Sequence, residues 1–514
     1  MASKQETTIR LRFWMDEEKK RVIVAEASGD FIDVLFSFLT LPLGTIMRLI
    51  SNNKPHSPLE IGCINNLYHS VQNFSTDVFW NRICQQMLLS PRNSLEAFCQ
   101  RLKLNVDDTE PTKYFMCGSC SKGKDLLLLS TFAGASCCYC EKSMIKEVKL
   151  LEESKEDACR GNGVFVKEDA MFLIFDDLRV LQSSPGTTVQ QLLQLGYMDF
   201  TKMKEMSLDV GMKEIFSILK QALTSKSPLS DVFLANEEPK SMYSFSPDTG
   251  PGYHRCSLKL KITVSKSRNK ILFAEAEGDF LDFLFSFLTI PLGSLLNLMN
   301  GKLFLGSIDN LYTSVKNMDS SWFIGSSSNS LLNPRVANQF GCISQPIHIP
   351  EEETPSYWYG IRVVKGSIRR EMISKNKDTV QDPVAMKLFE PRCCDGTREH
   401  AVGFMKRPCL FVVRDDLQVT PMTTTSSISF VHELNVPLDD FEEHLVDIRN
   451  AREALNLLGA SLTSKAALTQ SLFGLVKKSK CEMSILGCLR WKKERYGKKV
   501  DGKKEKKDEK KIEK

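Results

Sequence analysis

The chain contains one long segment twice. Residues 25–44 read AEASGDFIDVLFSFLTLPLG and residues 274–293 read AEAEGDFLDFLFSFLTIPLG, with 16 of 20 positions identical. The two segments lie 249 residues apart, far beyond the ~20 to 50 residues that separate solenoid repeats. We therefore expect two copies of a complete folding module rather than an array of short repeats.

Shorter matches in the same order extend both copies. Leu67-Tyr68 recurs as Leu311-Tyr312, Asp176-Asp177 as Asp415-Asp416, and residues 223–226 as residues 462–465. These matches predict a first module over residues 1–234 and a second over residues 256–476. Residues 235–255 are rich in Pro and Gly and lack apolar periodicity, so they are expected to be a linker.

Apolar periodicity predicts the same elements in each copy. Alternation indicates a β-hairpin over residues 8–14 and 21–27, repeated at 257–264 and 270–276. A buried helix follows, broken at Pro42 or Pro291, and then a helix over residues 64–74. Strands at 170–175 and 409–413 and closing helices at 212–223 and 451–462 complete an α+β fold. Because the prolines split the apolar segments 31–50 and 280–299, we expect no membrane span.

Charge is concentrated at the C-terminal end. Residues 489–514 hold 13 Lys/Arg against 6 Asp/Glu, a surplus of seven, so the net charge of +5 leaves −2 for the rest of the chain. Residues 477–514 are expected to be a basic disordered tail. The N-terminal residues lack the apolar core of a signal peptide, and the 16 cysteines are irregularly spaced. We expect reduced thiols and an intracellular protein, in the cytoplasm or alternatively the nucleus.

The clearest chemical signal is a set of cysteines within residues 112–145. Cys117 and Cys120 form one Cys-x-x-Cys pair, and after sixteen residues Cys137 and Cys140 form a second. This spacing is typical of a four-cysteine knuckle that holds one structural zinc ion per chain. The alternative is a hairpin of reduced cysteines without metal. The matching residues 356–366 contain no cysteine, so the second copy is expected to lack the site.

Taken together, the GDFxDxLFSFLTxPLG segment, the Leu-Tyr-x-Ser-Val segment, the Asp-Asp-Leu turn and the LTSK ending resemble the plant family catalogued as domain of unknown function 674. The resemblance covers nearly the whole chain except the linker and the tail. It implies no activity, because the family is defined by sequence alone. It also implies that Cys138 competes with Cys137 as a ligand, since family members commonly carry a Cys-x-Cys second knuckle.

Other titratable residues have structural explanations. The duplicated aspartates are expected to cap helices and turns: Asp30/Asp279, Asp33/Asp282, Asp176/Asp415 and Asp177/Asp416. Glu26 and Glu275 lie in apolar strands, where we expect an edge or solvent-facing position because an unpaired buried Glu is rare. The sequence has no phosphate-binding glycine loop, and we find no histidine that recurs at a matched position.

The sequence therefore favours a non-enzymatic intracellular binding or scaffold protein with protein partners, whose first module is stapled by zinc. One alternative is a zinc-containing nucleic-acid-associated protein that uses the knuckle and the basic tail. A second alternative is an enzyme with a site between the two modules. An enzyme of that kind predicts a deep pocket with polar groups from both copies, including Glu26 or Glu275.

Overall fold

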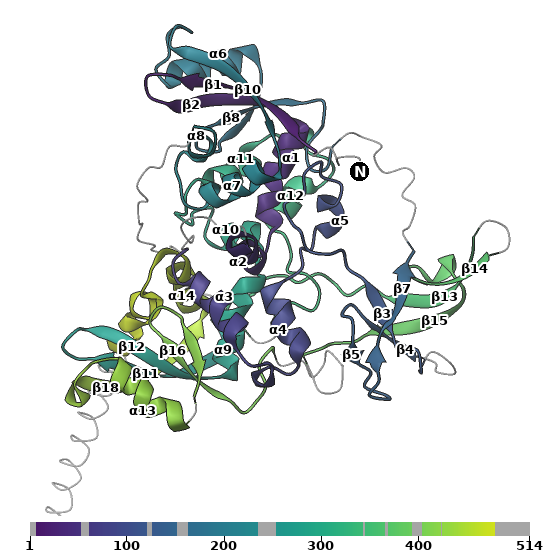
Figure 1. Ribbon diagram of the computed structural model, residues 1–514, viewed down its shortest axis with the longest axis vertical. Coiled ribbons are helices and arrows are strands. Elements are labelled where there is room, and N and C mark those ends of the chain that lie inside the picture. Colours follow the sequence, from purple (N-terminus) through teal and green to yellow (C-terminus); the bar gives the residue numbers. More distant parts are fainter. Residues whose placement is uncertain are drawn as a thin grey trace, which may run out of the picture.

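A computed structural model describes residues 7–52, 61–120, 126–151, 163–234, 253–342, 345–364, 368–392, 403–422 and 424–477. The chain has an α+β fold in which helices lie between two similar sheets, with a barrel to one side (Figure 1). The predicted tail from residue 478 onward, and the predicted linker up to residue 252, lie outside the described residues. In the described part, no helix is long and apolar enough to cross a membrane.

The first half of the chain forms one antiparallel five-stranded sheet with the order β10-β1-β2-β8-β9. Its strands are β1 (Ile9–Asp16), β2 (Arg21–Ser28), β8 (Met171–Phe175), β9 (Val180–Gln182) and β10 (Met203–Val210). Its helices are α1 (Gly29–Ser37), α2 (Leu43–Asn52), α3 (Ile64–Asn73), α4 (Arg82–Leu89), α5 (Glu96–Cys99), α6 (Pro185–Gln194), α7 (Met212–Ala222) and α8 (Pro228–Phe233).

The second half forms a sheet of corresponding order, β17-β16-β12-β11-β18. Its strands are β11 (Tyr253–Ser265), β12 (Lys270–Glu277), β16 (Leu410–Arg414), β17 (Val419–Pro421) and β18 (Phe441–Asn450). Its helices are α9 (Gly278–Ser286), α10 (Leu292–Leu298), α11 (Ile308–Asn317), α12 (Ser327–Leu332), α13 (Thr424–Glu433) and α14 (Ala451–Thr463), followed by a helix over residues 467–477. The predicted hairpins, broken helices and closing helices are all present within a few residues of their expected bounds.

The two halves exchange helices. Helix α3 of the first half lies against the second sheet, where Ser70 Oγ accepts the backbone N–H of Val419 at 2.9 Å. Helix α11 of the second half lies against the first sheet, where Ser314 Oγ accepts the N–H of Val180 at 2.9 Å. One hydrophobic core cluster accordingly contains buried residues of both halves. Each sheet is therefore completed by a helix from the other half.

The broken helices meet at the centre of this core. Backbone hydrogen bonds of 3.0 Å join Leu43 N–H to the Ile290 carbonyl and Leu292 N–H to the Leu41 carbonyl. A Cβ on Gly44 would lie 2.8 Å from the Leu88 carbonyl oxygen and 3.0 Å from that of Leu288. Glycine is required here because backbone atoms of both halves pass too close for any side chain.

The third sheet is a closed six-stranded barrel to which each half contributes three strands, with the order β13-β14-β7-β3-β4-β15. Its strands are β3 (Tyr114–Met116), β4 (Leu126–Ser130), β7 (Lys146–Leu150), β13 (Tyr357–Val364), β14 (Ile368–Ser374) and β15 (Gln381–Leu388). Strand β15 pairs parallel to β4, and β14 pairs parallel to β7. Apolar side chains such as Met116, Leu129 and Ile373 fill the interior. The barrel is thus a packed junction between the halves.

We predict that the halves stay together when the chain is cut between them. A protease recognition sequence inserted between residues 240 and 250 should allow cleavage into two fragments. The cleaved protein should still elute near the full mass of 58.2 kDa in size-exclusion chromatography at micromolar concentration, because the barrel and the exchanged helices need no covalent link. Fragments that elute separately without denaturant would contradict the exchange.

We also predict that Gly44→Ala lowers the free energy of unfolding by roughly 1–3 kcal/mol, since the added methyl meets backbone atoms that cannot withdraw. Gly186→Ala is the matched control, because no atom lies within 4 Å of its added Cβ. Urea denaturation of both variants measures the difference. Equal stability of the two variants would argue against the close crossing of the helices.

Candidate metal centre

Two tight turns present the predicted cysteines. Cys117 directly follows β3, and Cys137 directly follows the short strand β5 (Ala135–Ser136). Strand β5 pairs with β6 (Ser143–Met144) to close the second turn, in which Cys137 N–H donates to the Lys142 carbonyl at 2.9 Å. Glu141 N–H donates back to the Cys137 carbonyl at 2.8 Å. The hairpin therefore fixes the backbone between Cys137 and Cys140.

The structure brings the four cysteines together. The sulfur atoms of Cys117, Cys120, Cys137 and Cys140 all lie within 4.8 Å of one another. Cys117 Sγ is 3.4 Å from Cys140 Sγ, and Cys137 Sγ is 3.9 Å from Cys120 Sγ. Four thiolates at ~2.3 Å from a tetrahedral ion would lie about 3.8 Å apart. The sulfur positions fit one metal ion, and the four thiols are free of disulfides.

Local hydrogen bonds favour thiolate at one of the four positions. The backbone N–H of Lys142, together with neighbouring thiols, lowers the pKa of Cys140 to about 7. Burial raises the pKa of Cys137, although the N–H groups of Tyr139 and Cys140 bond its sulfur. Because a metal ion binds thiolates, its binding here would displace protons from the remaining thiols. These four residues could hold a metal ion.

Cys138 lies outside this group. Its side chain is exposed, whereas Cys137 is fully buried and lies within the four-sulfur group. Cys138 is the first residue of the turn that follows Cys137, and its side chain is exposed there. The geometry therefore favours the Cys-x-x-Cys spacing for the second pair over the Cys-x-Cys spacing that the family resemblance implies.

The charges around the four cysteines are mixed. Lys142 Nζ contacts Ser119 Oγ at 3.3 Å, and Lys146 Nζ forms an ion pair with Glu371 at 2.5 Å. Glu141 and Glu147 are the sequence neighbours of these two lysines. The described residues beside the knuckle thus form no uniform basic stripe.

Several of the duplicated aspartates form hydrogen bonds to segments far away in the sequence. The prediction that Asp30 caps α1 is wrong. Ser28 is the N-cap and makes no side-chain cap bond, while Asp30 forms an ion pair with Lys103 at 3.6 Å. Asp176 instead accepts the N–H of Ser230 at 2.8 Å, in the first turn of α8. The first turn of a helix has N–H groups without partners inside that helix, so a carboxylate more than fifty residues away can accept them as well as a local one could.

The second half repeats this arrangement. Asp415 accepts the N–H of Thr469 at 2.7 Å. The predicted bonds to nearby turn amides are made by the second aspartate of each pair: Asp177 accepts the N–H of Arg179, and Asp416 that of Gln418, each at 3.2 Å.

Asp33 and Asp282 are buried carboxylates with different partners. Asp33 accepts the N–H groups of Val164, Phe165 and Val166 at 2.6–2.9 Å, and burial raises its pKa to about 6. Asp282 accepts two backbone N–H groups and also pairs with Arg407 at 2.7 Å. Burial raises the pKa of Asp282 to about 7. Both carboxylates anchor a chain segment beneath the buried helices.

Glu26 and Glu275 do not lie on edge strands, so the edge alternative of that expectation is wrong, while both side chains are partly exposed to solvent. Each lies on the middle strand of its sheet, with 26% and 23% of the side chain exposed. Arg12 lies 3.7 Å from Glu26, and Lys261 lies 3.5 Å from Glu275. In each case a cation on the neighbouring strand offsets the cost of partly burying the carboxylate on a central strand.

Two cavities bear on the enzyme alternative. The cavity that Glu275 lines is formed by second-half residues alone, including Lys259, Asp447 and Arg449. A small cavity of about 290 Å³ lies between β9 and α11, with Gln182 and Asn317 in its wall, and it contains neither Glu26 nor Glu275. Neither of these cavities combines both halves with the duplicated glutamates.

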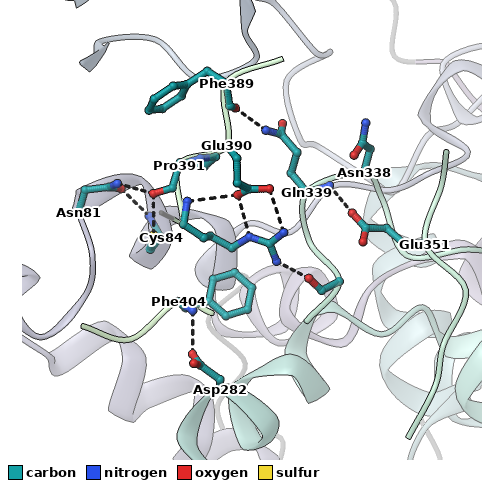
Figure 2. Close-up of polar contacts among 12 residues, drawn as sticks. Asn81, Cys84, Asp282, Asn338, Gln339, Glu351, Phe389, Glu390, Pro391 and Phe404 are labelled. Carbon is teal, nitrogen blue, oxygen red and sulfur yellow. Dashed lines mark hydrogen bonds and ion pairs between the residues drawn. The ribbon is translucent and has the colours of Figure 1, made fainter. Parts of the chain in front are cut away.

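A buried polar cluster that sequence reasoning missed lies next to the cysteines. Shortly after β15, Glu390 pairs with the Arg392 guanidinium at 2.8 Å, in the ion pair that is drawn below the Glu390 label in Figure 2. Both side chains are almost completely buried. Pro391 O accepts Asn81 Nδ2 at 2.6 Å. A Glu-Pro-Arg sequence gives no sign of burial by itself, and only the fold brings Asn81 of the first half to it.

The fold and the four-cysteine group define an α+β protein with two matched sheets and a candidate metal centre at the barrel. The family model described as "Protein of unknown function (DUF674)" matches residues 5–451. The chain therefore belongs to the DUF674 family. No curated protein and no solved structure matches it.

We predict that Asp33→Asn reduces the pH dependence of stability between about pH 4 and pH 6. In that range the folded protein keeps a proton on Asp33 that the unfolded chain has released, so the free energy of unfolding falls as pH rises. A pKa change from 3.8 to about 6 corresponds to up to about 3 kcal/mol. Urea denaturation at pH 4, 5 and 6 measures the slope. Asp209→Asn, at an exposed position on β10, is the control. An equal slope in wild type and Asp33→Asn would contradict the prediction.

Proposed function

We propose that this protein is a non-enzymatic intracellular binding or scaffold protein, in which Cys117, Cys120, Cys137 and Cys140 hold one structural zinc ion. The observation that carries the zinc assignment is the grouping of four thiols within 4.8 Å of one another. Zinc is the metal that tetrahedral all-thiolate sites of this spacing usually hold. Four sulfur ligands fill the coordination sphere and leave no position for water, so the ion stabilises structure rather than activating a substrate.

The intracellular assignment rests on the thiols. Cys117 and Cys140 lie 3.4 Å apart as free thiols, and buried Cys63, Cys84 and Cys99 are also free. Reduced cysteines in this number fit a compartment that keeps thiols reduced.

The binding role rests on exposed apolar side chains. On α6 and the loop that follows it, Val189, Leu193, Met198 and Phe200 are between 49% and 82% exposed. Large apolar side chains that gather on a surface commonly mark a protein contact. Protein partners are therefore favoured over nucleic acid, because the charges beside the knuckle are mixed.

We predict one zinc ion per chain in protein purified from zinc-supplemented cells, measured by elemental analysis. Cys117→Ser/Cys120→Ser should lose the zinc, because two of four ligands are gone. Cys138→Ser is the matched control in the same turn and should keep it, since its side chain lies outside the sulfur group. Wild-type protein without zinc, or zinc that survives the double substitution, would contradict the assignment.

A further inference from the structure

The barrel is built unequally by the two halves. The first half contributes β3, β4 and β7 with three, five and five residues, whereas the second contributes β13, β14 and β15 with eight, seven and eight. Short strands make few ladder hydrogen bonds and depend on neighbours or on cross-links for stability. The first-half strands are therefore the weaker side of the barrel.

The four cysteines stand next to the strands of this weaker side in the sequence. Cys117 is the residue after β3, while Cys120 and Cys137 precede and follow β4 in the sequence. One ion bound to all four sulfurs would fix the end of β3 and both ends of the chain segment that contains β4. Strand β4 is also the strand that pairs with β15 of the second half, from Leu126 opposite Ala385 to Leu129 opposite Leu388.

Phe389 connects the cysteines to the second half. It is the residue after β15, and it shares a small buried cluster with Cys117, Cys137 and Leu128. Its backbone N–H donates to the Leu129 carbonyl at 2.7 Å, and its carbonyl accepts Gln339 Nε2 at 2.6 Å. The ring of Phe389 therefore packs in the same cluster as two of the thiols, while its backbone closes the ladder between the halves.

The chain beyond Phe389 is held tightly. Arg392 pairs with Glu390, donates to the Gly341 carbonyl, and lies 5.5 Å from the ring of Phe404 (Figure 2). A buried ion pair of this kind tolerates little displacement, because breaking it leaves an uncompensated charge. The segment after β15 is thus a rigid support on one side of Phe389, and the four-cysteine group lies on the other side.

We propose that metal occupancy of the four-cysteine centre controls the pairing of β4 with β15, and hence the closure of the barrel that joins the two halves. This inference rests on the metal binding proposed above and adds its consequence for the other half of the chain. With the ion bound, Phe389 packs against a fixed knuckle. Without it, the four sulfurs are released, Cys120 and Cys137 no longer hold the two ends of the segment that contains β4 together, and the pairing of β4 with β15 up to Phe389 opens.

Hydrogen exchange of the full chain tests the proposal. Zinc-loaded wild-type protein is compared with the same protein after chelation, with zinc content measured in both samples. Removal of zinc should lower the protection of amides 385–389 at least about tenfold, while peptides from β11 and β12 keep theirs. Unchanged protection at 385–389 after proven loss of zinc overturns the coupling. Absence of zinc from the untreated protein instead overturns the metal assignment itself.

A reciprocal test needs no chelator, since two coupled sites must affect one another equally. Phe389→Ala keeps all four ligands and should weaken zinc binding about five- to tenfold, measured by competition with a chromophoric zinc chelator. Leu445→Ala is the control, an apolar side chain that is 77% exposed on the second sheet. Equal zinc affinity in folded Phe389→Ala and in the control overturns the proposal, whatever the exchange data show.

Discussion

At the centre of the molecule the two broken helices cross so closely that the backbone of one half supplies the hydrogen bonds of the other. Leu43 and Leu292 donate to carbonyls across the crossing, at full burial, where an unbonded amide would be costly. Glycine one residue later in each half allows the approach. After this crossing, each chain continues toward the other half and packs against its sheet. The exchange of α3 with α11 and the shared barrel both follow from that crossing.

The same burial explains why the halves retain duplicated carboxylates and why their surroundings differ. Asp33 and Asp282 each bond backbone N–H groups of the segment that leads into the next sheet strand. Asp282 also faces Arg407, while the corresponding position in the first half is Glu168. Among the described residues, the carboxylate of Asp33 is therefore bonded by backbone amides, and that of Asp282 by backbone amides and a guanidinium. Burial is the largest influence on both, and it raises the pKa of Asp33 to about 6 and that of Asp282 to about 7.

Local elements could be predicted from the sequence, whereas contacts between the halves could not. Alternation located β1, in which buried and exposed side chains alternate from Ile9 to Phe13. Its partner β2 was located with it as the second strand of a hairpin, although Val22–Ala25 are buried on both faces of the sheet. Nothing local indicates that Ser70 bonds Val419, since such a contact depends on which half a helix packs against. The barrel could not be predicted for a related reason, because a three-residue strand such as β3 is too short to show the alternation of apolar and polar residues. The cysteine spacing was readable, because ligand geometry is set by residues close in sequence, but the position of the cysteines beside Phe389 was not.

The restriction of the four cysteines to one half becomes intelligible from the barrel. A strand is stabilised residue by residue, so β13, β14 and β15 gain from their greater length. A metal ion contributes its binding energy at one point, so it can stabilise a segment whose strands are too short to gain much from pairing. In the second half the residues that match the knuckle contain no cysteine, and the chain after β15 is held by the buried Glu390–Arg392 pair. The longer strands β13, β14 and β15 hold their side of the barrel through ladder hydrogen bonds, so a second four-cysteine knuckle would add little stability there.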